Sequence, residues 1–398
     1  MKCKITNNKI KNVISFGKMP LANGFLNKKD FKKEFFYNLE TGFSEKLSLF
    51  QLNDHPKPKQ MFNIKYPFFT GSSKYMKTHF QKYSKMIKGL LQPNSKLIEI
   101  GSNDGTFLKN FSNSKIKSVG FEPSKNVSDI AKKNKIDSRN KFFSYKNILN
   151  EKSFLNKTDI ICASNVICHI PDLRDLIKSI DLLLNKNGLF IFEEPYLGSM
   201  FEKVSYDQIY DEHIYIFSAS SIKKIFNLFD FELIDAIPQI THGGSMRYII
   251  SRSKNRKTSK RLSKILDYEK KNNIDNFESC KKFKKDCENS RNNLRLKIKK
   301  LKENGKTICG YAATSKSTTI LNYCNIDNTM LDYIADTTPE KIGKFSPGKH
   351  IPIVSMDYFR KNLTDSIYLF AWNHKNEIFK KEKKILKKKI NWFSHIKL

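Results

Sequence analysis

The stretch Leu97-Ile-Glu-Ile-Gly-Ser-Asn-Asp-Gly105 is the part of this 398-residue sequence that decides the fold. It begins as an apolar strand and then turns through Gly101 and Gly105, which allow the backbone to approach a ligand closely. A helix over Phe107 to Phe111 is expected next, and its N-terminus would offer unpaired N–H groups. The spacing E-x-G-x-x-x-G differs from the dinucleotide fingerprint G-x-G-x-x-G and favours a nucleoside ligand without a pyrophosphate. An ordinary strand–turn–helix without a ligand is the alternative.

Two further predicted strands end in polar residues. Glu122-Pro123 follows the strand predicted over 116–121, about twenty residues beyond the glycine loop, where Rossmann-type sites place the carboxylate that accepts the ribose hydroxyls. Asn165-Val166 and His169 follow the strand predicted over 159–163. Since ligands bind at the carboxyl ends of strands in open α/β sheets, Asn165 and Val166 are expected beside a cofactor and His169 towards a substrate. A surface glutamate and a structural histidine are the alternatives.

Strand and helix patterns alternate over residues 76–253, which predicts an α/β fold with a central Rossmann-like domain. A small N-terminal domain of short strands and turns is expected over 1–75. Two long charged helices and a second, reduced Rossmann-like unit are expected over 254–398. The other segments expected to form strands are 96–100, 188–193, 231–236, 246–251, 307–313, 332–335 and 366–371.

The composition excludes several classes of protein. The formal net charge of +34 comes mostly from lysines spread from end to end, and no motif for reading RNA or DNA accompanies it. We therefore expect no nucleic-acid partner, although an anionic substrate would benefit from the positive field. The seven cysteines contain no C-x-x-C pair, which argues against a disulfide framework and an intact zinc site. The sequence lacks an apolar run of spanning length and an N-terminal apolar leader, which predicts a cytoplasmic protein without a membrane partner.

One polar cluster suits proton abstraction. Tyr210, Glu212 and His213 lie within four residues of one another and can supply a phenol donor, an orienting carboxylate and a general base. Deprotonating a carbon next to a ketone needs such a base, together with donors that stabilise the enolate oxygen. A structural role for the cluster is the alternative.

Two later segments suit anion binding. Gly243-Gly244-Ser245 can form a tight turn that approaches an anion or a substrate. A strand ending in small residues leads to Lys316, and Asp336 follows the next strand, an arrangement suited to phosphate or pyrophosphate. This is not a Walker A loop, because G-x-x-x-x-G-K is absent. A purely structural domain is the alternative.

Taken together, the sequence resembles the S-adenosylmethionine-dependent C-methyltransferases of deoxysugar biosynthesis, which act on nucleotide-linked 4-keto-6-deoxysugars. The resemblance runs nearly end to end. The motifs that carry it are Pro20-Leu-Ala-Asn-Gly-Phe25, Gln51-Leu52, Met61-Phe62, Tyr66, Glu99 to Phe107, Asn165 to Pro171, Glu194-Pro-Tyr196, Tyr210 with Glu212-His213, His242-Gly-Gly-Ser-Met-Arg247, Asn322-Tyr-Cys324 and Ala371-Trp-Asn373.

The resemblance implies a small N-terminal domain, a central class I methyltransferase domain and a C-terminal Rossmann-like domain. S-Adenosylmethionine would be the cofactor, and a nucleotide sugar would bind between the last two domains. His213 would remove the proton from C3′, next to the C4′ ketone, with Glu212, Tyr210, His169 and Tyr66 around the sugar, and the enolate would attack the sulfonium methyl. The cofactor-binding residues would be Glu99, Gly101, Asn103, Gly105, Glu122, Pro123, Asn165 and Val166. The substrate-binding residues would be Glu194, Tyr196, His242, Gly243, Gly244, Ser245, Arg247, Lys316 and Asp336.

The sequence departs from this family near its N-terminus. Family members bind a structural zinc through two C-x-x-C pairs, but here only Cys3 remains of the first pair, and the second falls on Ser44 and Leu47. One thiolate cannot form a tetrahedral site, so no metal is expected. Methyl transfer to oxygen or nitrogen of a related sugar, and a non-catalytic protein that docks through its basic surface, are the alternative functions. The chain is expected to be a monomer or a homodimer.

Overall fold

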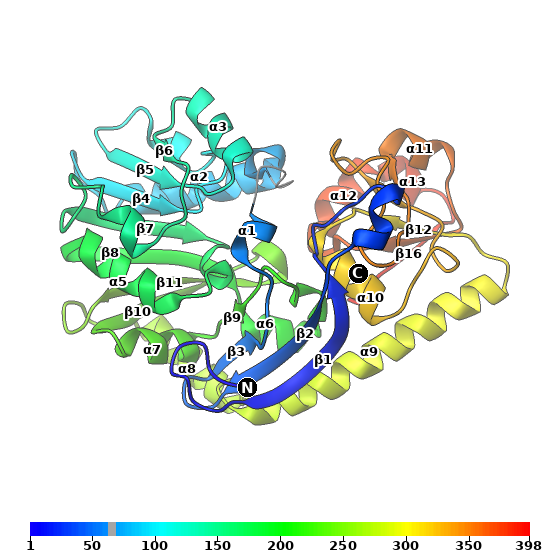
Figure 1. The fold of residues 1–398 in the computed structure, drawn as a ribbon, viewed down its shortest axis with the longest axis horizontal. Helices are drawn as coiled ribbons and strands as arrows, with labels where there is room; N and C mark the ends of the chain where they lie inside the picture. Colours follow the sequence, from blue (N-terminus) through cyan, green and yellow to red (C-terminus); the bar gives the residue numbers. More distant parts are fainter. Residues whose placement is uncertain (63–68) are drawn as a thin grey trace.

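The computed structural model describes residues 1–62 and 69–398, which form three β-sheets and the helices that cover them. Figure 1 shows the central sheet on the left and the C-terminal sheet on the right, with the long N-terminal strands between them. The α/β fold expected from the sequence is confirmed. Every helix in the described ranges is too short or too polar to cross a bilayer.

The central sheet has seven strands in the order β10-β11-β8-β7-β4-β5-β6. All neighbouring pairs from β8 to β6 are parallel, whereas β11 runs antiparallel to both β8 and β10. The chain enters at β4 and adds strands first on one side and then on the other, so the gap between β4 and β7 is the topological switch point at which such sheets bind ligands. The strands are β4 (Lys96–Ile100), β5 (Lys117–Phe121), β6 (Ser138–Arg139), β7 (Thr158–Ser164), β8 (Leu184–Pro195), β10 (Phe231–Gln239) and β11 (Ser245–Arg252).

Helices flank this sheet, and their apolar faces join the two clusters that the sheet buries. In α5, for example, Asp172 caps the N-terminus by accepting the N–H groups of Arg174 and Asp175, and Leu176 and Ile180 face the core. The helices of this part are α2 (Lys74–Lys88), α3 (Lys125–Lys133), α4 (Tyr145–Ile148), α5 (Leu173–Leu183), α6 (Leu197–Lys203) and α7 (Ala219–Asn227).

The segment after the glycine loop corrects one prediction. Instead of a helix over Phe107 to Phe111, the chain forms only a short 3₁₀ turn, Leu108–Phe111. The Asp104 carboxylate accepts the backbone N–H of Thr106 within the loop. It also accepts the N–H of Gly71, which ties the loop to the segment before α2. The aromatic side chains of this turn pack into the core, so tertiary packing replaces the helix that the pattern suggested.

The N-terminal sheet has the order β1-β2-β3-β9 and is antiparallel. Its strands are β1 (Lys11–Pro20), β2 (Phe36–Ser44), β3 (Leu49–Leu52) and β9 (Tyr215–Ile216), and the short helix α1 (Pro58–Met61) follows β3. The last strand, β9, comes from the central part of the chain, directly after His213. The segment that carries His213 is therefore fixed to the N-terminal sheet as well as to the central domain.

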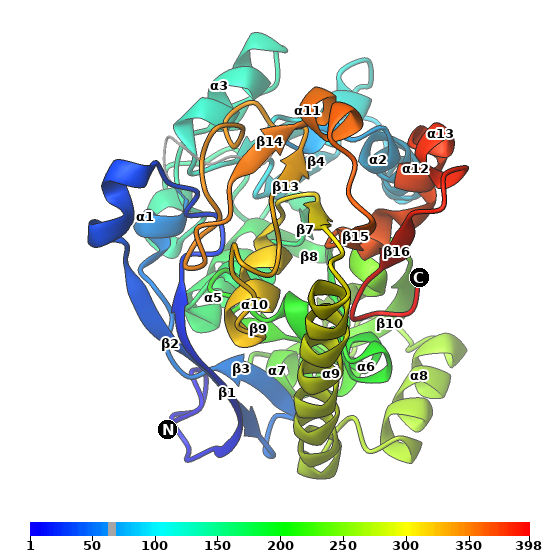
Figure 2. The ribbon, with the colours of Figure 1, turned by 90° about the vertical axis from the view of Figure 1, so that its right-hand side faces the viewer.

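The helices α8 (Lys260–Lys271) and α9 (Phe277–Glu303) confirm the two long helices expected before the C-terminal unit. The view in Figure 2 shows α9 beside the N-terminal strands, and α9 packs against β1. One apolar cluster contains Phe16 of β1, Phe283 of α9 and Ile320 of α10, so the N-terminal and C-terminal parts share a core. Burial of such side chains contributes about 1.5–3 kcal/mol each relative to exposure, which holds the parts together.

The C-terminal sheet has five parallel strands in the order β14-β13-β12-β15-β16, again with the first strand in the middle. Its elements are β12 (Ile308–Tyr311), α10 (Ser315–Tyr323), β13 (Ile334–Asp336), β14 (Ile353–Ser355), α11 (Met356–Lys361), β15 (Ser366–Leu369), α12 (Lys375–Lys381), α13 (Lys383–Leu386) and β16 (Asn391–Phe393). The second Rossmann-like unit is confirmed. The short strands β14 and β16 were not predicted from the sequence, whereas β13, equally short, was.

Candidate active site

A cavity of about 340 Å³ lies at the carboxyl ends of β4, β5 and β7 and faces the start of α10. It has a sheet half, formed by Gly101, Asn103, Glu122, Asn165 and Val166 at the strand ends. It also has an interdomain half, in which the central, N-terminal and C-terminal parts meet. The predicted site residues that line the cavity are Gly101, Asn103, Glu122, Pro123, Asn165, Val166, His169, Tyr210, Glu212, His213, His242 and Lys316.

The shape of the sheet half depends on glycine at position 101. Its φ of +66° belongs to the left-handed region, and a Cβ at this position would lie 2.3 Å from Cγ2 of Val166. Only glycine avoids both the strain and the clash. Next to it, the side-chain oxygen of Asn103 accepts the N–H of Thr70 at 2.9 Å, so the glycine loop is tied to the segment that leads into α2.

Glu122 ends β5 with its carboxylate held in place by the backbone. Oε1 accepts the N–H of Ser124 at 2.7 Å, and Oε2 accepts the N–H of Asn103 at 3.1 Å. Each oxygen keeps a second lone pair for a ligand hydroxyl. Burial raises the pKa of Glu122, and the backbone hydrogen bonds oppose that rise. The ribose-binding role of Glu122 stays a prediction, and this geometry leaves both oxygens able to accept a further hydrogen bond.

Two polar atoms at the end of β7 are buried without a protein partner. Within the described residues, neither Oδ1 of Asn165 nor Nε2 of His169 has a hydrogen bond. Leaving such an atom unsatisfied costs about 1–3 kcal/mol, so native sites pair it with a ligand or water. Burial lowers the pKa of His169 to about 3, so its ring is neutral near pH 7.

His213 is a neutral base with a defined tautomer. Its Nδ1 lies 2.7 Å from the carbonyl oxygen of Gln208, which can only accept, so Nδ1 carries the proton. Nε2 therefore presents its lone pair, and the hydroxyl of Tyr210 donates to it at 2.8 Å. Burial and the neighbouring His169 hold the pKa of His213 well below its usual range. The two histidine rings stack with their centroids 5.3 Å apart.

Glu212 is the point at which three parts of the chain meet. Its Oε1 accepts a hydrogen bond from Nδ2 of Asn23 at 2.7 Å, and Oδ1 of Asn23 accepts one from the hydroxyl of Ser315 at 3.0 Å. The carboxylate of Asp211 accepts the N–H of Ala22. The acidic cluster therefore fixes the loop after β1 to both the base segment and α10.

The buried Lys316 and the partly buried Lys341 bring positive charge to the interdomain half. Nζ of Lys316 lies 3.4 Å from the carbonyl of His242 and from Oδ1 of Asn373, above the ring of Trp372. Nζ of Lys341 donates to the carbonyl of Ala313 at 2.8 Å. Burial lowers the pKa of both lysines, while nearby acids, Asp207 for Lys316, oppose this shift. Two cations that make only weak or neutral contacts suit an anionic ligand.

The remaining predicted residues do not line the cavity: Glu99, Gly105, Glu194, Tyr196, Gly243, Gly244, Ser245, Arg247 and Asp336. Several of them support it from behind. Oε1 of Glu194 accepts the N–H groups of Val166 and Ile167, which fixes the loop after β7. Oδ2 of Asp336 accepts the N–H of Ala313 and so shapes the loop before α10.

The others have structural contacts. The guanidinium of Arg247 pairs with Glu193 and lies over the ring of Tyr83, and the hydroxyl of Tyr196 donates to Glu269. Glu99 is buried, and burial together with nearby acids raises its pKa. The three residues of the 243–245 turn pack closely, with the first against an indole and the last bonded to Thr241, and Gly105 packs against Ile136.

The cavity also contains residues that were not assigned to the site from the sequence: Asn23, Phe142, Phe143, Thr314, Ser315, Lys341, Asn373 and His374. Asn23 and Asn373 lie in motifs that had been noted, but no local pattern says that these motifs meet. Phe142 and Phe143 follow the two-residue strand β6, which left no signal. Tyr66, predicted beside the sugar, lies outside the described residues.

Family models match three consecutive parts of the chain. A putative zinc binding domain matches residues 3–62, a methyltransferase domain matches 74–236, and the C-methyltransferase C-terminal domain matches 240–396. The chain is also 25% identical to the C-methyltransferase NovU of Streptomyces niveus over 378 residues, which cover 94% of this chain and 90% of NovU.

The chain is an S-adenosylmethionine-dependent methyltransferase, and it is similar to C-methyltransferases over nearly its whole length. Its central sheet is the class I methyltransferase fold. The sheet half of the cavity fits the cofactor, because it combines the close-packed Gly101, the buried carboxylate of Glu122 and the unsatisfied oxygen of Asn165.

Two of the solved methyltransferase structures that align with this chain each cover less than half of it. One, a possible histamine N-methyltransferase from Thermotoga maritima, is 18% identical, with 44% of this chain and 89% of that chain covered and a TM-score of 0.34. Another, from Anabaena variabilis, is 21% identical, with 43% and 82% covered and a TM-score of 0.35. Alignments with TM-scores this low carry no weight for function.

The zinc expected of the N-terminal family domain does not fit the residues of this methyltransferase. Cys3 is the only cysteine in the matched range 3–62. The backbone at Cys3 still makes a tight turn. The N–H of Cys3 donates to the carbonyl of Asn8, and the carbonyl of Cys3 accepts the N–H of Asn7. However, Cys3 and Leu47 are buried in the same apolar cluster, so packing occupies the region in which four thiolates would be required.

Proposed function

We propose that this methyltransferase transfers a methyl group to the carbon next to the ketone of a nucleotide-linked keto-deoxysugar, with His213 as the base. The observation that carries the proposal is the tautomer of His213. A neutral ring with Nδ1–H fixed on a carbonyl presents a basic Nε2 in the cavity that also contains the cofactor-binding strand ends. Methyl transfer to a hydroxyl oxygen can also use such a base, so the position of the methyl group in the product distinguishes the two reactions.

The residues of the interdomain half suit enolate formation. Nε2 of His213 would take the proton from the carbon, and the C–H electron pair would form the enolate double bond as charge passes to the ketone oxygen. Tyr210 and His169 lie beside His213 and are the candidate donors to that oxygen. S-Adenosylmethionine, when bound, supplies an electrophilic methyl group. Glu122 and Asn165 would orient it by its ribose hydroxyls and its polar end.

The lysines of the interdomain half support a nucleotide as the activating group. Among the described residues, neither the buried Lys316 nor the partly buried Lys341 has a carboxylate within hydrogen-bond range, and a diphosphate would satisfy both. Thr314 and Ser315 line the same side of the cavity at the start of α10, where hydroxyl groups and the helix N-terminus favour an anion.

The proposal is tested by mass spectrometry of products from labelled S-adenosylmethionine and a panel of dTDP- and GDP-linked keto-deoxysugars. We expect a label on carbon, and exchange of the adjacent C–H with solvent when the reaction is run in deuterated water without S-adenosylmethionine. Label on oxygen or nitrogen, without that exchange, would contradict the assignment of His213 as a carbon base.

A further inference from the structure

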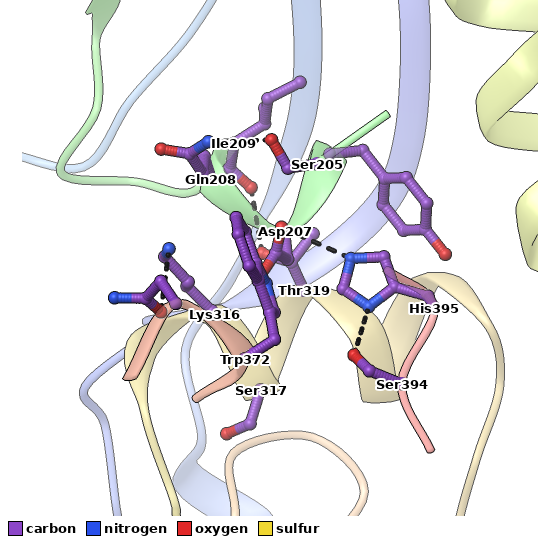
Figure 3. Close-up of polar contacts among 12 residues, drawn as sticks. Ser205, Asp207, Gln208, Ile209, Lys316, Ser317, Thr319, Trp372, Ser394 and His395 are labelled. Atoms are coloured by element: carbon purple, nitrogen blue, oxygen red, sulfur yellow. Dashed lines mark hydrogen bonds and ion pairs between the residues drawn. The ribbon is translucent and has the colours of Figure 1, made fainter. Parts of the chain in front are cut away.

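The segment that carries the base is held by the C-terminal domain. Nδ1 of His213 donates to the carbonyl of Gln208. Asp207, the residue before Gln208, is fully buried. Figure 3 shows Asp207 between Trp372 and His395, both from the C-terminal domain. The carbonyl of Ile209 is also held from that domain, by the hydroxyl of Thr319 at 2.8 Å. Hydrogen bonds from α10 and Trp372, together with an ion-pair contact from His395, therefore meet the backbone or side chains on both sides of Gln208.

The partners of Asp207 are oriented donors. Nε1–H of Trp372 donates to Oδ2 at 2.7 Å, and Nε2 of His395 lies 3.3 Å from Oδ1. The hydroxyl of Tyr368 accepts the backbone N–H of His395 and lies 2.8 Å from its Nδ1, which orients Nε2 towards Asp207. Burial alone would raise the pKa of Asp207, but the charges of His395 and Lys316 and the indole hydrogen bond hold it below its usual value.

Trp372 links the same acid to the cavity. Nζ of Lys316, which lines the cavity, lies 4.7 Å from the centre of the indole ring. The ring also packs against Gly243, where a Cβ would come within 2.1 Å of it, beside the cavity residue His242. The side chain of Trp372 therefore contacts Asp207, Lys316 and the 241–245 turn.

We propose that Asp207, Trp372 and His395 form an interdomain anchor that positions the carbonyl of Gln208 and thereby sets the orientation and tautomer of His213. The C-terminal domain would then control the base directly, in addition to its contact with substrate. All three are positioning residues, because none lines the cavity. The catalytic meaning of the anchor rests on the proposed function, but its effect on the Nδ1–H of His213 does not.

The test uses the full chain and four variants. Trp372→Phe removes the indole N–H but keeps a ring beneath Lys316, and His395→Ala removes the second partner. His395→Gln restores an N–H donor and is the rescue variant. Glu382→Gln is the matched control, since Glu382 is also a buried acid of the C-terminal domain, bonded to Tyr311 and Arg360 rather than to the base segment.

The first readout is NMR of protein with ¹⁵N-labelled histidine. The Nδ1–H signal of His213 is identified by its absence in His213→Asn, and its exchange with water is measured. Trp372→Phe and His395→Ala should speed that exchange by about tenfold or more, because local opening of the hydrogen bond becomes easier. His395→Gln should recover much of the protection, and Glu382→Gln should match the unmodified protein. Calorimetry with S-adenosylhomocysteine checks that the sheet half is intact.

The second readout is methyl transfer to dTDP-4-keto-6-deoxyglucose. A base displaced by a fraction of an ångström should lower kcat by about 10- to 100-fold while KM for S-adenosylmethionine stays unchanged. Unchanged Nδ1–H exchange in both Trp372→Phe and His395→Ala, or equal effects in Glu382→Gln, would overturn the anchor. Absence of methyl transfer by the unmodified protein would instead contradict the proposed function, and the exchange measurement would still decide on the anchor.

Discussion

The two halves of the cavity are built in different ways. The sheet half takes its residues from three strand ends of one sheet, between Gly101 and Val166, and each is fixed by backbone hydrogen bonds close by. The interdomain half joins Asn23, His213 and Lys316, which are far apart in the chain and depend on contacts between domains. We infer that the first half is a property of a local fold, whereas the second is a property of assembly. A substitution that impairs one half should therefore leave the function of the other half intact.

The largest effect is expected for a substitution of the base, which should affect the interdomain half and leave the sheet half intact. His213→Asn should lower turnover by about 10²- to 10⁴-fold, the usual contribution of a positioned general base, and leave the affinity for S-adenosylmethionine near normal. Product formation and calorimetry measure the two quantities. His55→Asn is the control, since the one side-chain hydrogen bond of His55 among the described residues is with the neighbouring carbonyl of Pro56. Retained turnover in His213→Asn would refute the base assignment.

The opposite substitution tests the sheet half. Glu122→Gln should weaken binding of S-adenosylmethionine by about 1.5–3 kcal/mol, because it removes a charged acceptor and points an N–H group at a backbone donor. Glu99→Gln is matched to it, as an equally buried acid at the neighbouring strand end that does not line the cavity. Calorimetry that gave both variants the same affinity would remove the ribose role from Glu122.

The same contrast decides what the sequence could predict. Glu122, Asn165 and Gly101 were predictable because position at a strand end determines where a side chain lies in an open α/β sheet. His213 and Lys316 could be proposed from residue type and family resemblance, but their meeting with Asn23 could not. That meeting depends on β9 pairing with β3 and on the core shared by β1, α9 and α10, which are long-range contacts without a local signal.

The steric fit of the sheet half is tested by substituting two glycines that have nearly the same φ. Gly101 and Gly305 have φ values of +66° and +67°, but a Cβ at Gly305 would meet nothing within 4 Å. Both Gly→Ala variants should lose about 1–2 kcal/mol of stability from the left-handed conformation, and Gly101→Ala about 1–3 kcal/mol more from the clash with Val166. Denaturant unfolding measures this difference. Equal losses would show that Val166 yields, and the close packing of the loop would not matter.

The pH dependence of turnover sharpens the assignment to the interdomain half. The base form of His213 is unprotonated, and its pKa is held well below 6.5 by burial and by His169. Lowering the pH therefore protonates His213 only after the pH passes below that lowered value. We expect kcat to stay level from pH 8 down to 6.5, the usual histidine value. A loss of activity centred near pH 6.5 would show that His213 is exposed to solvent during turnover.

The smallest expected effect is none, and it concerns the N-terminal domain that supplies Asn23. Because Cys3 and Leu47 belong to an apolar cluster, EDTA should leave the melting temperature and turnover unchanged, and elemental analysis should find no stoichiometric zinc. Among the described residues, Cys168, His169 and His213 form a group of possible metal donors within 4.8 Å of one another. If zinc is found, its loss in Cys3→Ala would place it in the N-terminal domain and contradict the prediction. Its retention would place it at the base, where EDTA should then raise turnover, because a metal on Nε2 would occupy the lone pair that removes the proton.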